Sequence, residues 1–306
     1  MIYLTYDNRK HTDGAGAQLQ CILSIYMISK YYNVAYIHSP LYELNYQGLA
    51  CLEKNQSDPI QIEKYNTLFT LPSHPCEEFN EIHEIKHFDE DTIRRYKSSS
   101  KNILLKITYG HKLVDKKREI LNVPVSFPWL ETRLRRPCNI AVHIRRGDVV
   151  EPKRMLPNSY YIKCMKALEK ILDEANISYE FHIYTENVSK DVIITSRHHG
   201  VKGLLHHPVT IKPQDARLNE LACVKNLFFH VNTSPIETLQ ELCNADILLA
   251  SRSSYSYVAG IVKKKGVVLQ HPFWHALKQS WIPVKKASNI LTHKDTILEN
   301  ILSQNE

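Results

Sequence analysis

Several common sequence signals are missing from this chain, and each absence narrows its class. The 306 residues contain no apolar run near the roughly 20 residues that a membrane-spanning helix needs. The N-terminus becomes polar too soon for a signal peptide. The seven cysteines have an odd count and no CxxC pair, which favours reduced thiols over a disulfide framework or a zinc site. We therefore expect a soluble, cytoplasmic protein without a transmembrane segment.

Signals for a metal or for serine-hydrolase chemistry are also weak. No G-x-S-x-G turn is present. The acidic run Asp89-Glu-Asp91 could bind a divalent cation, but it precedes a helical pattern, and acidic residues favour the first turn of a helix. The pairs His198-His199 and His206-His207 are expected on a loop and are poorly spaced for one tetrahedral zinc site. We predict no metal and no obligatory cofactor.

The charge balance permits an anionic partner but does not choose one. The formal net charge is +7 and the pI is about 8.9. The 39 basic residues are scattered, whereas a nucleic-acid-binding surface would group them on one face. We expect no nucleic-acid partner. A non-catalytic protein that binds a polyanion or a glycan remains an alternative from another class.

Strands and helices alternate in the two parts of the chain where the pattern is clear, which is typical of a parallel sheet covered on both faces. Near the N-terminus the expected order is strand, glycine turn, helix, strand. From about residue 43 to residue 136 the pattern weakens to polar helical segments and loops. The alternation returns after Pro137 and ends in a C-terminal helix from about residue 293. The expected elements of the two clear parts are strands at 2–6, 34–38, 140–144, 180–184, 227–231, 247–250 and 267–270, and helices at 19–32, 158–175, 235–244 and 253–262.

The fold class is therefore α/β, with two domains that face a cleft. Residues 1–137 would form an N-terminal α/β domain that carries the glycine–Gln turn, and residues 138–306 a C-terminal α/β domain that ends in a helix. In such folds a ligand lies beyond the carboxyl ends of the strands.

The expected strand at 140–144 ends in an unusual set of side chains. His143 is followed by Arg145 and Arg146, then by a glycine and Asp148. An arginine can place two parallel hydrogen bonds on a phosphate. An ion pair between Arg146 and Asp148 is the purely structural alternative. The whole combination favours an anion-binding site, with Asp148 as a general base or as a partner that holds an arginine.

Two further stretches could contribute to such a site. The sequence SRSSYS, residues 251–256, follows an expected strand and leads into a helix. The first N–H groups of that helix lie at the positive end of its dipole and can bind an anion, although serine capping alone would also explain the pattern. The turn Gly14-Ala-Gly16-Ala-Gln18 lets the backbone approach a ligand closely. It does not match the dinucleotide-binding pattern G-x-G-x-x-G.

Taken together, the three stretches resemble the fucosyltransferase superfamily that uses GDP-fucose. Residues 143–148, HIRRGD, resemble the H-x-R-R-x-D motif of its α-1,2 and α-1,6 branches. Residues 14–18 resemble the N-terminal glycine–Gln motif, and residues 251–259 resemble the late serine-rich donor motif. The three occur in the order of that family. The resemblance does not extend to residues 40–135.

The resemblance implies a GT-B-like fold of two Rossmann-like domains. Residues 1–137 would lie on the acceptor side of the cleft, and residues 138–306 would bind the nucleotide sugar. It also implies an inverting transfer of L-fucose from the donor GDP-fucose to a hydroxyl of a glycan acceptor. Arg145 would contact the β-phosphate with Arg146 in support, and His143 would lie near the guanosine. Asp246 would meet the guanine. The full set of implied donor-binding residues is His143, Arg145, Arg146, Gly14, Gly16, Gln18, Asp246, Ser251, Ser253, Ser254 and Tyr255.

The chemistry of such a transfer fits these residue types. Breaking a sugar–phosphate bond leaves negative charge on the diphosphate, and removing one fixed donor to such a charge often costs about 3 to 4 kcal/mol. The incoming hydroxyl needs a base, for which Asp148 is the first candidate and Glu151 the second. The α-1,6 branch places its base farther on, where this chain has Lys153, so both carboxylates stay open. The same architecture with another nucleotide sugar is a further alternative. We expect the tryptophans to fill cores rather than to stack on sugar rings: Trp129, Trp274 and Trp281.

Overall fold

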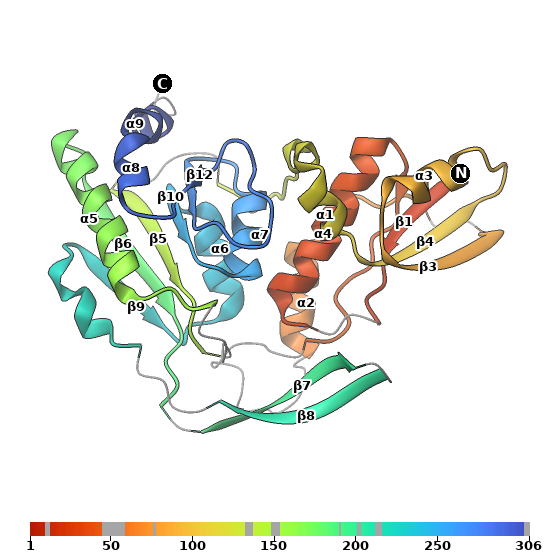
Figure 1. Ribbon diagram of the computed structural model, residues 1–306, viewed down its shortest axis with the longest axis horizontal. Coiled ribbons are helices and arrows are strands. Elements are labelled where there is room, and N and C mark those ends of the chain that lie inside the picture. Colours follow the sequence, from red (N-terminus) through yellow and green to blue (C-terminus); the bar gives the residue numbers. More distant parts are fainter. Residues whose placement is uncertain are drawn as a thin grey trace.

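The computed structural model describes most of the chain as two parallel sheets, each covered by helices (Figure 1). The described residues are 1–9, 13–44, 59–75, 78–131, 137–147, 154–189, 191–200, 203–211 and 216–302; residues 192–200 and 203–211 are described by their backbone alone. Among the helices of these ranges, none combines the length and apolar character that crossing a membrane requires.

The first sheet is formed by the N-terminal part of the chain. Its four parallel strands lie in the order β2-β1-β4-β3. Their bounds are β1 Ile2–Tyr6, β2 Ala35–Tyr36, β3 Glu81–His87 and β4 Ile103–Tyr109. The accompanying helices are α1 Ala15–Tyr32, α2 Pro59–Leu68, α3 Glu90–Lys97 and α4 His111–Lys116, followed by a 3-10 helix at Arg118–Asn122.

The expectation of irregular structure between residues 43 and 136 is corrected here. β3 and β4 lie in that segment, and β4 is an inner strand that pairs with both β1 and β3. β3 was hard to predict because it lies at the sheet edge, where Ile82 is more than half exposed and polar residues alternate with it. The segment therefore completes the first sheet.

The second sheet has six parallel strands in the order β12-β11-β10-β5-β6-β9. Numbered along the chain within this sheet and read from β9, the order is 3-2-1-4-5-6, which is that of a doubly wound dinucleotide-binding fold. The strands are β5 Cys138–Ile144, β6 Tyr179–Thr185, β9 Leu227–Val231, β10 Ile247–Ala250, β11 Val267–Gln270 and β12 Ile282–Pro283. The helices are α5 Asn158–Glu174, α6 Pro235–Asn244, α7 Ser254–Val262, α8 Ser288–Thr292 and α9 Lys294–Leu302, with a 3-10 helix at Leu218–Cys223.

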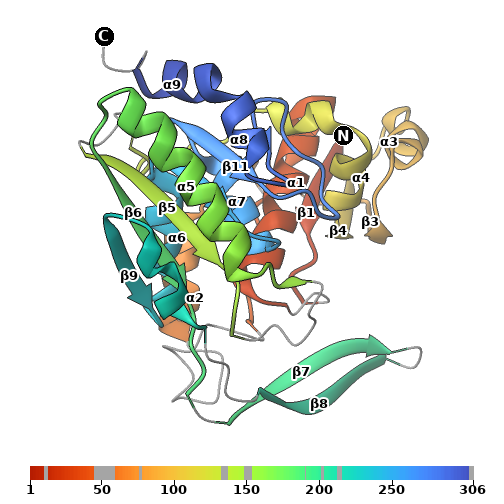
Figure 2. The same cartoon turned by 60° about the vertical axis from the view of Figure 1, so that its left-hand side comes forward.

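A two-stranded antiparallel hairpin extends away from both sheets (Figures 1 and 2). It consists of β7 Val192–Gly200 and β8 Gly203–Ile211. The four histidines that were expected on a loop lie on these strands, so that expectation is corrected. The regular pairing of β7 with β8 across nine residue pairs explains the difference.

Two hydrophobic cores stabilise the fold. One lies between α5 and the second sheet and includes Val142 and Phe181. The other runs from the first sheet through α1 into α6 and α7, and it joins Leu19 to Val258. The two sheets are therefore connected through a shared core beside α1 and α7. This α/β architecture of two parallel sheets, with the cavity described below between them, agrees with the expected GT-B-like class.

Candidate functional site

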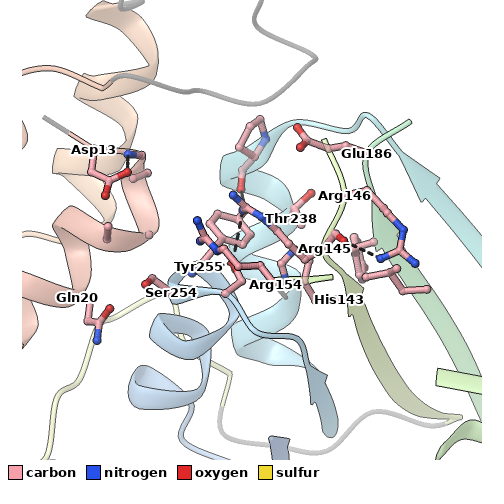
Figure 3. Close-up of a pocket in the computed structure, with 18 of the residues that line it drawn as sticks. Asp13, Gln20, His143, Arg145, Arg146, Arg154, Glu186, Thr238, Ser254 and Tyr255 are labelled. Carbon is pink, nitrogen blue, oxygen red and sulfur yellow. Dashed lines mark hydrogen bonds between the residues drawn. The ribbon is translucent and has the colours of Figure 1, made fainter. Parts of the chain in front are cut away.

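A cavity of about 360 Å³ lies at the carboxyl ends of the strands of the second sheet, against the start of α1. In a sheet of order 3-2-1-4-5-6, this is the edge where ligands bind, and β5 and β10 are the two strands at which the order reverses. Figure 3 shows Asp13 and Gln20 on one wall, and Arg145, Arg154 and Tyr255 facing them. The cavity therefore takes side chains from both parts of the chain.

Arg145 and Ser253 come together at this point of reversal. They follow β5 and β10, which pair directly, and Arg145 Nη1 donates a hydrogen bond of 3.4 Å to Ser253 Oγ although 108 residues separate them. Ser253 is also the N-cap of α7, because its Oγ accepts from the backbone N–H of Tyr255 at 3.3 Å. A guanidinium and the positive end of a helix dipole thus border the same space, together with Ser254.

Arg146 has a different position from its neighbour. Its guanidinium donates to the carbonyl of Arg145 at 2.7 Å, to the carbonyl of Leu156 at 3.2 Å and to Asn158 Oδ1 at 2.6 Å. Asn158 in turn donates to the carbonyl of Ala216 at 2.9 Å. In Figure 3 the Arg146 side chain points away from the other arginines. Arg146 therefore holds the backbone from which Arg145 extends.

His143 is buried and neutral. Burial, and then the nearby positive charge of Arg145, lower the pKa of His143 from 6.5 to about 3. Its Nδ1 shares a hydrogen bond of 2.9 Å with Ser251 Oγ, which also contacts Ser256 Oγ at 3.5 Å. Its ring lies 5.6 Å from the ring of Tyr255. His143 lines the cavity. Ser251 is fully buried and holds the His143 ring through their hydrogen bond.

Tyr255 contributes its ring and backbone rather than a free hydroxyl. The hydroxyl donates to the carbonyl of Pro235, and burial raises the pKa of Tyr255 well above its usual value. The backbone N–H points to Ser253 Oγ. The resemblance implies that Ser253, Ser254 and Tyr255 hold the diphosphate through hydroxyls and helix N–H groups; because the Tyr255 hydroxyl is bonded to Pro235, the hydroxyls left for that role are those of the two serines.

The residues of the N-terminal turn have two different positions: the glycines lie at the cavity and Gln18 lies in the protein interior. Gly14 and Gly16 line the cavity, and Gly16 lies against Tyr255, so that a Cβ there would come within 2.5 Å of the Tyr255 nitrogen. Gln18 is fully buried. Its amide donates to the carbonyls of Asp13 and Glu43, at 2.7 Å and 2.6 Å. Gln18 thus fixes the turn, while the two glycines bring the backbone to the cavity.

Asp246 lies away from the other predicted donor-binding residues. It precedes β10, at the opposite end of the sheet from the cavity, and is fully buried. Its carboxylate accepts from the backbone N–H of Asn139 at 2.8 Å and pairs with Lys265 at 3.2 Å. The structure therefore places Asp246 in a buried ion pair and not beside the cavity.

Asp148 and Glu151, the two candidate bases, lie outside the described residues. The segment that carries them begins after Gly147 and ends before Arg154, and both Arg146 and Arg154 line the cavity. The cavity wall also contains two acidic side chains that sequence reasoning missed, Asp13 and Glu186. Glu186 follows β6, and its carboxylate fills the space where a Cβ on Gly147 would lie.

Further cavity residues belong to none of the three motifs. Arg154, Trp274 and His275 line the cavity, as does His111 at the start of α4. The expected strand at 267–270 ends at Gln270, and residues that follow a strand lie at the ligand-binding edge of such a sheet. This position is the signal that could have placed Trp274 at the cavity.

Metal binding has no support among the described residues, which hold no cluster of three or more histidine, cysteine or acidic side chains that could bind a metal ion. Asp89 is the N-cap of α3 and accepts from the backbone N–H of Thr92 at 2.9 Å. This confirms the expected helix-start role of the acidic run at 89–91.

Comparisons with known proteins find distant structural similarities. No family profile and no curated protein matches the chain. Escherichia coli heptosyltransferase WaaC with ADP-2-deoxy-2-fluoro heptose is 11% identical, covers 100% of both chains and has a TM-score of 0.40. Arabidopsis thaliana FUT1, as a mutant in complex with GDP, is 9% identical over 93% of this chain and 73% of that chain, with a TM-score of 0.39. The α-1,6-fucosyltransferase NodZ of Bradyrhizobium, soaked with GDP-fucose, is 9% identical over 85% and 92%, with a TM-score of 0.37. Similarity at this level carries no information about the chemistry of the cavity.

Proposed function

We propose that this protein is an inverting glycosyltransferase that moves L-fucose from GDP-fucose to a hydroxyl of a glycan acceptor. The observation that supports it most is the hydrogen bond between Arg145 Nη1 and Ser253 Oγ at the start of α7. This contact brings two of the three motifs that resemble GDP-fucose-dependent enzymes to one wall of one cavity. Gly14 and Gly16 of the third motif line the same cavity.

The charges of this wall suit a leaving diphosphate. The C1–O bond of the donor sugar breaks and its electron pair stays on the β-phosphate oxygen. Arg145 and the N–H groups at the start of α7 are fixed before that charge develops, so they stabilise it without reorganisation. Arg154 adds a second guanidinium to the cavity. Neutral His143 would pack beside the nucleoside as a hydrogen-bonding group rather than as a counter-ion.

The acceptor hydroxyl must lose its proton to a base as its oxygen attacks C1 from the opposite face. Asp148 is the first candidate and Glu151 the second in this proposal. The transfer then releases GDP and the fucosylated glycan.

Donor hydrolysis by the purified protein tests this proposal. GDP-fucose, ADP-heptose and UDP-glucose would be supplied separately, and release of the nucleoside diphosphate measured. We expect GDP-fucose to be consumed and Arg145→Ala to reduce the rate at least about a hundredfold, as for loss of a fixed donor to a developing anion. Arg94→Ala is the matched control, because the Arg94 side chain is 74% exposed on α3.

If another donor is preferred, that donor takes the place of GDP-fucose in the proposal, and the assignment as a glycosyltransferase stands. No turnover of any donor, or full activity of Arg145→Ala, would contradict the proposal itself.

A further inference from the structure

Trp274 differs from the other two tryptophans in its surroundings. Trp281 is 6% exposed and packs in the core, and Trp129 packs among Phe69 and Phe127 with its Nε1 bonded to the carbonyl of Leu68 at 2.7 Å. Both therefore have the core role that the sequence predicts. Trp274 is 55% exposed and lines the cavity, so its expected core role is corrected. An exposed indole in a cavity is a surface to which a flat ring can bind.

The indole is held in place from its polar end. Trp274 Nε1 can only donate, and it donates to His275 Nε2 at 2.9 Å. His275 Nε2 must therefore be the acceptor, so that the ring proton lies on Nδ1, which faces Asp115 Oδ2 at 3.3 Å. Asp115 also accepts from the backbone N–H of Ala276 at 2.9 Å. A carboxylate of α4, in the N-terminal part, thus fixes the orientation of Trp274 through one histidine.

The position of Trp274 along the sheet edge relates it to the diphosphate site. Arg145 follows β5, the serines follow β10, and Trp274 follows β11, the next strand. Neighbouring strands lie about 4.8 Å apart, so β11 lies roughly 10 Å from β5. Trp274 lines the same cavity as Arg145, which can hold both a diphosphate and a sugar attached to it or attacking it. Arg154 lies over the indole, with its guanidinium carbon 5.4 Å from a ring centroid. In Figure 3 Arg154 extends into the space beside Tyr255.

The other end of the cavity is chemically different. Beyond β6 and β9 the wall presents Glu186, Thr233 and Thr238, whose oxygens can bind the donors and acceptors of a nucleoside. The Trp274 end offers a half-exposed indole with the Arg154 guanidinium over its ring. A pyranose ring has an apolar face and a rim of hydroxyls, so its chemistry matches that end.

We propose that Trp274 is the stacking platform for a pyranose ring in the cavity, with Arg154 bonding to a ring hydroxyl and with Asp115 and His275 as positioning residues. This rests on the proposed function, in which the cavity holds a diphosphate bonded to one sugar and attacked by another. The ring belongs either to the transferred sugar or to the acceptor, and both present the same chemistry to the indole.

Tryptophan emission and binding together test this proposal. The wild-type protein, Trp274→Ala, Trp274→Phe and the control Trp129→Phe would be titrated with GDP, with GDP-fucose, and with methyl β-D-galactopyranoside in the presence of GDP. We expect a sugar-bearing ligand to change the emission of the wild type and of Trp129→Phe but not of Trp274→Phe. In Trp274→Ala its dissociation constant should rise about fivefold while that of GDP changes less than twofold.

The two sources of the ring give different patterns. A loss seen with GDP-fucose assigns the platform to the transferred sugar, and a loss seen only with the methyl glycoside assigns it to the acceptor. Equal weakening of GDP and GDP-fucose would overturn the proposal in favour of a base-stacking role, as would unchanged affinities for all three ligands. If GDP does not bind the wild type, GDP-fucose is not the donor, and the response to the glycoside alone then decides the role of Trp274.

The positioning residues have their own readout. Asp115→Asn keeps an acceptor for Ala276 but removes the charge that holds the Nδ1 proton of His275. We expect the emission anisotropy of Trp274 to fall and the affinity for the sugar-bearing ligand to drop about twofold, with GDP affinity kept. Anisotropy equal to that of the wild type would show that Asp115 does not position the indole.

Discussion

Gly16 at the start of α1 lies directly against the backbone of Tyr255 at the start of α7. A Cβ placed on Gly16 would be 2.5 Å from the Tyr255 nitrogen and 2.6 Å from its Cα. Backbone atoms cannot yield as the end of a flexible side chain can, so the two helices can approach this closely only through glycine. The contact joins the first sheet to the anion-binding helix start.

Gly16→Ala is therefore expected to destabilise the protein and to weaken nucleotide binding. Inserting one methyl group into a packed contact costs about 1–3 kcal/mol, and displacement of Tyr255 would also move Ser253. Urea unfolding and GDP titration measure the two effects. Gly14→Ala is the control for stability, because Gly14 has φ −64° and ψ 161°, which alanine adopts freely. Equal stability of the two variants would contradict the role of the contact.

Arg146→Ala should reduce stability more than a change at an exposed arginine does. The substitution leaves the carbonyls of Arg145 and Leu156 without their donor, which we expect to cost about 3 kcal/mol in urea unfolding. Arg94→Ala, on the surface of α3, should cost less than about 0.5 kcal/mol. Arg146→Lys should recover only part of the loss, because an ammonium cannot make the forked contacts. Wild-type stability of Arg146→Ala would refute a scaffold role.

His143 should make the protein less stable in mild acid. Its pKa is about 3 in the folded protein and near 6.5 in the unfolded chain, so between these values the unfolded chain binds more protons. The stabilising contribution is complete above about pH 6.5 and is lost as the pH falls toward 3, by roughly 1.4 kcal/mol per pH unit. Unfolding at pH 7, 6 and 5 should show this slope as a difference between the wild type and His143→Gln. Parallel curves for the two proteins would contradict a neutral, buried imidazole.

Lys263 should make the stability of the protein depend on pH in the alkaline range. Burial lowers its pKa from 10.5 to about 7, although the nearby Asp246 opposes the shift. The unfolded chain therefore binds more protons between pH 7 and 10.5. The contribution to stability is complete above about pH 10.5 and is lost as the pH falls through 7.

Lys263→Met keeps a side chain of similar length without the titration. Relative to this variant, the wild type should gain roughly 1.4 kcal/mol of stability per pH unit between pH 7.5 and 9.5. Urea unfolding across that range measures the gain, and a constant difference between the two proteins would show that Lys263 stays charged.

The sequence predicts some parts of this structure well, for identifiable reasons. Residues 140–144 and 247–250 are short apolar runs that end in polar turns, and both are fully buried parallel strands. Their identity as strands is local information. The two strands are neighbours in the sheet, and this brings Arg145 to Ser253. The pairing depends on the strand order of the sheet, which neither run of residues reveals.

Other features had no sequence signal strong enough to identify them. Asp115 and His275 are 160 residues apart, and their contact exists only because α4 lies against the residues after β11. Asp246 precedes a buried strand and so lies at the end of the sheet opposite the cavity, and the sequence carries no signal for its ion pair with Lys265. β3 was missed because an edge strand with one exposed face has a mixed polar pattern.

The core that passes from the first sheet through α1 into α7 has a consequence for how the protein moves. Swinging the two halves apart would expose that continuous apolar interior to water, so wide opening would cost much of what keeps the chain folded. Ligand exchange must then proceed through small local rearrangements at the rim of the cavity, and the two halves should melt together as a single cooperative body.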